Sequence, residues 1–67
     1  MNEGLEDELY SVNAQMDSII DLMIEKYGKF VTKADLNGAS DAFKADLVRN
    51  YDSLQKRKDY LAAVLSL

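Results

Sequence analysis

The chain has 67 residues, a net charge of −4, and neither cysteine nor histidine. This length allows a single domain, residues 1–67, and the missing residue types exclude disulfides and thiolate- or imidazole-bound zinc as sources of stability. The negative charge disfavours binding to nucleic acid and to anionic membrane surfaces.

The first predicted element is a helix over about residues 5–27. Its apolar residues recur in steps of three and four, which is the spacing of one buried helical stripe. They are Leu5, Leu9, Val12, Met16, Ile19, Met23 and Tyr27, with Ile20 beside them. Acidic residues occupy the opposite side of this helix. Gly28 follows Tyr27 and suits a left-handed C-terminal cap.

The connection is predicted over residues 28–40, where the helical spacing breaks. Thr32 and Asp35 have the spacing of a weak capping box, and a short helical turn is expected over Lys33–Asn37. We expect three apolar residues of this segment to close the end of the fold. They are Phe30, Val31 and Leu36.

The second predicted helix covers about residues 41–65, with Ser40 as its N-cap and Asp41 in its first turn. Its buried stripe is predicted to contain Phe43, Leu47, Tyr51, Leu54, Leu61 and Leu65, with Ala62 alongside. Lys58 interrupts this stripe. We expect its side chain to reach the edge of the interface or to pair with a carboxylate such as Glu8.

Two such helices joined by a short connection predict an all-α fold, an antiparallel helical hairpin with a short helical turn in the connection. Completion of a bundle by oligomerisation remains open, and the alternative is one continuous helix that dimerises. The antiparallel register places Glu8 beside Arg57 and Lys26 beside Asp46. Both pairs join opposite charges, which helps to select this register.

Candidate chemistry is sparse. Asp17, Asp21 and Glu25 share one helix face, but without a second converging group they are better explained as a solvated surface than as metal ligands. No serine has a histidine base, and a hairpin offers little concavity. We therefore predict no enzyme activity, no cofactor and no metal. The basic cluster Lys56–Lys58 is interpreted as setting the register against the acidic N-terminus rather than as a phosphate contact.

Apolar residues outside the two stripes predict a binding surface. They are Tyr10, Leu22, Ile24, Val48, Tyr60, Val64 and Leu67. Because the C-terminal segment is apolar almost all round and tyrosine is favoured at interfaces, we expect this surface at the end built from both termini. The predicted partner-binding residues are Tyr10, Lys58, Tyr60, Val64 and Leu67.

These features favour a non-enzymatic protein–protein interaction module, such as a small adaptor, a co-chaperone subunit or an inhibitor. The alternative is a self-associating four-helix-bundle regulator, with a link to nucleic acid left open. The expected partner is thus a protein or a second copy, with nucleic acid disfavoured and no membrane. The acidic N-terminus lacks the pattern of a secretory signal and no apolar run reaches the ~20 residues of a membrane span, so a cytoplasmic location is expected.

The length, the L-E-D-E-L opening at residues 5–9, the glycine-bearing turn and the apolar second helix are together similar to one known group of proteins. These are the helical-hairpin co-chaperones that guard needle subunits in bacterial type III secretion. The resemblance implies a hairpin that binds another protein, and it assigns no site residues. Small acidic, helical phage-encoded inhibitors fit the same features.

Overall fold

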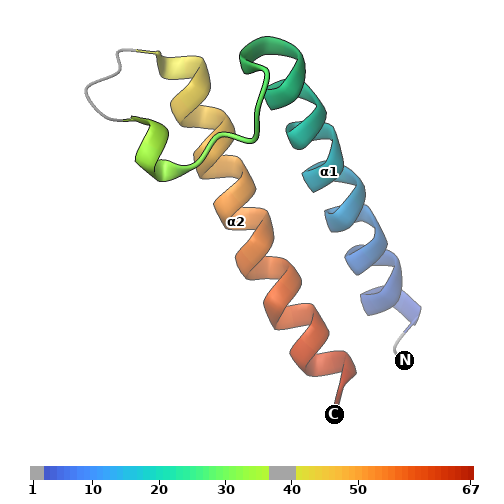
Figure 1. Ribbon diagram of the computed structural model, residues 1–67. Helices are drawn as coiled ribbons and strands as arrows, with labels where there is room; N and C mark the ends of the chain where they lie inside the picture. The colour runs from blue at the N-terminus through green and yellow to red at the C-terminus, as the bar shows by residue number, and fades with distance from the viewer. Residues whose placement is uncertain (1–2, 37–40) are drawn as a thin grey trace.

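The computed structural model describes residues 3–36 and 41–67. Helix α1 covers Glu3–Tyr27, a 3-10 turn η1 covers Lys33–Leu36, and helix α2 covers Ala42–Leu65. The helices run antiparallel, so that both termini lie at the same end of an elongated molecule of 44 × 19 × 15 Å (Figure 1). This arrangement confirms the predicted all-α hairpin and contradicts one continuous helix.

The core between the helices consists of two apolar clusters. At the end near the termini, Val12 and Met16 of α1 enclose Leu61 of α2. At the opposite end, Met23 packs with Val31, Leu47 and Val48. The half-buried ring of Tyr51 packs against both clusters and so joins them. The stripe predicted from Leu5 to Tyr27 is confirmed, since its members are either buried or packed against a buried neighbour. Ile20, expected beside this stripe, is half-buried and belongs to neither cluster.

The connection does more than close the end of the hairpin. It returns along the flank of α2, where η1 packs against this helix (Figure 1). Val31 is buried against Val48, and the Phe30 ring meets the Tyr51 ring edge-on at a centroid separation of 5.0 Å. The connection therefore acts as a partial third layer over the first half of α2.

Two predictions about α2 are corrected by the structure. Val48 was expected to be unused surface, but it is only 7% exposed because the connection covers it. Phe43 was expected in the buried stripe, but it is exposed. The reason is that the end of α1 supplies a cation there rather than an apolar side chain, with Lys26 Nζ 4.6 Å from the centre of the Phe43 ring.

The caps of the two helices differ in how well the sequence predicts them. Gly28 has a φ of 74°, as expected for a left-handed C-terminal cap, and its N–H donates to the Ile24 carbonyl. The N-cap of α2 is Asp41 rather than Ser40, which lies outside the described residues. Asp41 is the cap because its Oδ1 accepts the Lys44 N–H at 3.0 Å.

Replacing Gly28 by alanine is expected to destabilise the hairpin by about 1 kcal/mol, because a Cβ is disfavoured in the left-handed region. The added methyl meets no atom within 4 Å, so the loss comes from the backbone alone. Gly4 is the matched control. It lies in the first turn of α1 with open space around it, so Gly4→Ala is expected to be neutral or stabilising. Urea denaturation measures the free energy of unfolding of both variants, and equal effects at the two positions would contradict the assigned conformation of Gly28.

Candidate functional site

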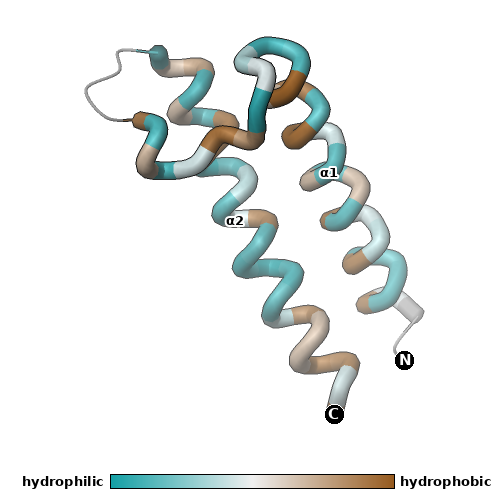
Figure 2. The backbone as a smooth tube through the Cα atoms, in the orientation of Figure 1, coloured by the Kyte–Doolittle hydropathy of each residue, from teal (hydrophilic) through white to brown (hydrophobic). Residues whose placement is uncertain are grey.

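The candidate site is the apolar surface at the end of α2, close to both chain termini. In Figure 2 the middle of α2 is hydrophilic and the last turns before the C-terminus become hydrophobic. Tyr60 is 57% exposed and Leu67 is fully exposed, while Val64 is half-buried between them. Arg57, Tyr60 and Val64 follow one another at spacings of three and four residues, so they share one face of α2. Leu67 comes just after the helix, which ends at Leu65. These four residues are called the terminal surface below.

The Tyr60 ring in this surface is held by a chain of contacts that crosses the hairpin. The Arg57 guanidinium lies over the Tyr60 ring at 5.2 Å from its centre, and Arg57 Nε donates to Glu8 Oε2 of α1. This hydrogen bond lowers the pKa of Glu8 and raises the pKa of Arg57. The predicted Glu8–Arg57 pair is therefore confirmed. Because Arg57 is fixed from the other helix, the Tyr60 ring has a preferred position before any partner binds.

The structure does not bring all the predicted site residues together. Tyr10 is 78% exposed, but it follows Glu8 by two residues, which is about 200° around α1. Since Glu8 faces Arg57 and Tyr60, Tyr10 lies on the opposite flank of the hairpin. Tyr10 and Tyr60 therefore lie near the same end of the hairpin, as expected, but on different flanks.

Lys58 takes no part in the terminal surface contacts. It is half-buried beside the interface, and the ion pairs found among residues 3–36 and 41–67 do not include it. Its expected partner Glu8 bonds to Arg57 instead. The neighbouring Lys56 pairs within α2, with Asp52 at 3.3 Å.

The other predicted interhelical pair is also corrected. Asp46 bonds to Arg49 within α2 at 2.9 Å, and Lys26 lies over Phe43. A neighbour one turn away in the same helix is closer than a lysine across the interface. A hydrogen bond also joins the two helices at this end, since the Tyr27 hydroxyl donates to Asp41 Oδ2 at 2.8 Å. The Lys44 N–H and this hydroxyl both lower the pKa of Asp41.

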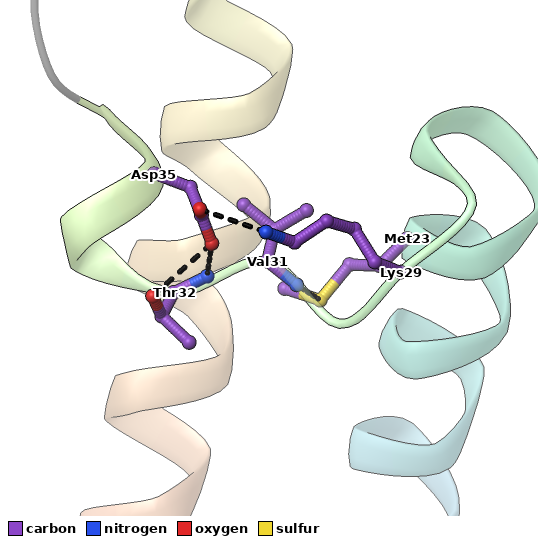
Figure 3. Close-up of polar contacts among 5 residues, drawn as sticks. All are labelled: Met23, Lys29, Val31, Thr32 and Asp35. Carbon is purple, nitrogen blue, oxygen red and sulfur yellow. Dashed lines mark hydrogen bonds and ion pairs between the residues drawn. The ribbon is translucent and has the colours of Figure 1, made fainter.

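The connection is held by hydrogen bonds among its own residues and by one hydrogen bond to α1, shown in Figure 3. Asp35 Oδ2 accepts the Thr32 N–H at 2.8 Å, while Oδ1 accepts Lys29 Nζ at 2.9 Å. This confirms the carboxylate half of the predicted Thr32–Asp35 capping box. The buried Val31 N–H donates to Met23 Sδ at 3.4 Å. The sulfur thus accepts a bond from an amide that the core removes from water, which hydrophobic spacing alone does not predict.

The Asp35 contacts make the connection sensitive to acid. The Thr32 N–H and then Lys29 lower the Asp35 pKa from 3.8 to about 2. Because the folded-state pKa is lowered, this stabilisation is complete above the unfolded value and is lost as the pH falls toward 2. We expect Asp35→Asn to weaken the hairpin at pH 6 and to reduce its further loss of stability between pH 4 and pH 2. Urea denaturation at several pH values tests this, and an unchanged acid dependence in Asp35→Asn would contradict it.

A small hollow lies where the connection meets α2. It has a volume of about 180 Å³, and its apolar lining comes from Phe30, Val31, Val48 and Tyr51. Ligand pockets for small molecules usually measure about 300–1,000 Å³. The hollow therefore has room for one side chain rather than for a substrate. Among the described residues, no three acidic side chains gather closely enough to hold a metal ion.

No helix in the described parts of the chain combines the length and apolarity needed to cross a bilayer. Comparison with protein-family models, curated proteins and solved structures finds no match.

Proposed function

We propose that this hairpin is a non-enzymatic protein-interaction module that docks its terminal surface on a larger protein. Adaptor, co-chaperone subunit and inhibitor are the forms of this role that a rigid helical hairpin suits. The observation that carries the proposal is the amount of surface the hairpin leaves exposed.

A globular monomer of 7.5 kDa exposes about 4,250 Å². The hairpin exposes 4822 Å², which is roughly 570 Å² more than this relation gives. One partner in a standard protein interface contributes about 800 Å². The excess is thus about 70% of the surface that one partner contributes to such an interface.

The composition of the terminal surface supports the same proposal. Tyrosine and arginine are enriched among the residues that contribute most to binding, and Tyr60 stacks with Arg57 here. A side chain that is already held in place loses less conformational entropy when it binds. The Glu8–Arg57 bond therefore favours docking through Tyr60, with Val64 and Leu67 as its apolar neighbours.

The experiment compares what the tagged chain captures from an extract of its host before and after the terminal surface is changed. Mass spectrometry should identify a protein whose recovery falls at least about ten-fold with Tyr60→Lys and Val64→Lys together. Since Val64 is half-buried, the separate variant Leu67→Lys keeps the test valid if the first one is poorly folded. Circular dichroism checks the helix content of each.

The matched control places the same two charges on the same helix at exposed polar positions, as Asn50→Lys and Ser53→Lys. This control should retain capture. Equal capture by all variants would contradict the terminal surface as the docking site. Sedimentation of the chain alone separates docking on another protein from self-association, because a stable dimer at micromolar concentration would support the bundle instead.

A further inference from the structure

A second apolar and charged surface runs along the flank of α1 on the side away from Tyr60. Its residues follow in steps of four, three, four, three and four, which places them in one line along the helix. They are Glu6, Tyr10, Asn13, Asp17, Ile20 and Ile24, with Asp21 beside Asp17. These seven residues are called the α1 flank. Tyr10 is 78% exposed and Ile24 is 52% exposed, so the line presents one large apolar side chain near its start and another at its end.

The charge between Tyr10 and Ile24 is negative and uncompensated. Asp17 and Asp21 lie between them and Glu6 lies one turn before Tyr10; all three are exposed, and none of them belongs to the ion pairs found among the described residues. The only cation of α1 is Lys26, which lies over Phe43 next to α2. The α1 flank therefore offers unpaired carboxylates between two apolar contacts about 21 Å apart.

This arrangement argues against a second copy as the occupant. Asp17 lies midway between Tyr10 and Ile24 in the sequence. A two-fold antiparallel contact that set Tyr10 of one copy against Ile24 of the other would bring the two Asp17 carboxylates together. Like charges opposed at an interface are strongly disfavoured. Nucleic acid is disfavoured for the same reason.

From this charge complementarity we infer that the α1 flank binds a cationic amphipathic helix of another protein. Such a helix would place apolar side chains on Tyr10 and Ile24, about four turns apart, and lysines or arginines against Asp17 and Asp21. The α1 flank shares no residue with the terminal surface. Each surface can therefore fail its test without affecting the other.

The probe is a synthetic helical peptide with one leucine stripe flanked by lysines, labelled for fluorescence anisotropy. Its twin has glutamate at every lysine position. The hairpin should bind the lysine peptide at least about ten-fold more tightly than the glutamate peptide. The affinity should fall as salt is raised from about 0.05 to 0.5 M, because exposed charges are screened. Equal binding of both peptides, or binding of neither, would overturn the inference.

Variants then locate the binding on the α1 flank. The double variant Asp17→Asn with Asp21→Asn should bind the lysine peptide about ten-fold more weakly than the unchanged hairpin does. The control, Asp7→Asn with Glu25→Gln, removes the same charge from exposed positions elsewhere on α1 and should change binding less than about three-fold. Equal losses of affinity in the two double variants would show that the peptide is attracted by net charge alone, and would overturn the assignment of the site to the α1 flank. The inference would also be overturned if the chain formed a dimer that Ile24→Asp dissociates into monomers, because a second copy would then occupy this surface.

Discussion

Replacing Leu61 by alanine is expected to destabilise the hairpin by about 3 kcal/mol. Leu61 is fully buried, and it is the α2 residue that Val12 and Met16 enclose. Truncation removes its contacts and leaves a cavity that two rigid helices cannot close. A domain of this length has a total stability of only roughly 3–10 kcal/mol. We therefore expect Leu61→Ala to lose at least about a third of the free energy of unfolding, measured by urea denaturation at 25 °C.

The control for this variant is Leu22→Ala, the same chemical change in a helix at a side chain that is 43% exposed. It should alter the free energy of unfolding by less than about 1 kcal/mol. If Leu61→Ala were no more destabilising than Leu22→Ala, the cluster of Val12, Met16 and Leu61 would not be a core.

The second large effect is expected for Val48→Asp, at about 3 kcal/mol of destabilisation. Val48 lies against Val31 and Met23, where the connection folds back over α2. A carboxylate at this position would be removed from water by apolar neighbours. We expect the connection to separate from α2 or the hairpin to unfold, and urea denaturation followed by circular dichroism measures the loss.

Ser53→Asp is the matched control for Val48→Asp, because it adds the same charge in the middle of α2 at an exposed position. It should change stability by less than about 0.5 kcal/mol. The same variants also test the covering layer. A Val48→Asp protein as stable as Ser53→Asp would show that the connection does not cover this flank of α2.

The features that could be predicted from the sequence are those set by spacing within one helix. The α1 stripe from Leu5 to Tyr27 recurs regularly, and the structure packs it against α2. The Glu8–Arg57 pair was also predictable, because an antiparallel register follows once two helices and a short connection are assumed. Gly28 was predictable because few other residues adopt its φ of 74°.

The features that could not be predicted depend on where the connection goes. Val48 lies off the α2 stripe, so only the return of the connection along α2 explains its burial. Asp41 replaces Ser40 as the N-cap and also accepts the Tyr27 hydroxyl, a contact between residues distant in the sequence.

The candidate site shows the same division. The exposed residues at and just after the end of α2 were identified by composition, and Tyr60 and Leu67 are exposed in the structure. Their grouping with Tyr10 failed, because nearness along the hairpin axis does not determine the flank on which a residue lies. Two residues of separation place Tyr10 and Glu8 on opposite sides of α1.

Small-angle X-ray scattering at decreasing concentration tests the central claim that α1 and α2 pack against each other within one chain. The scattering mass should be that of a 7.5 kDa monomer, with a radius of gyration close to the 13.9 Å of the Cα trace. A continuous 67-residue helix would instead be about 100 Å long, with a radius of gyration of about 29 Å. A radius of gyration near this larger value, measured at the mass of a monomer, would contradict the hairpin.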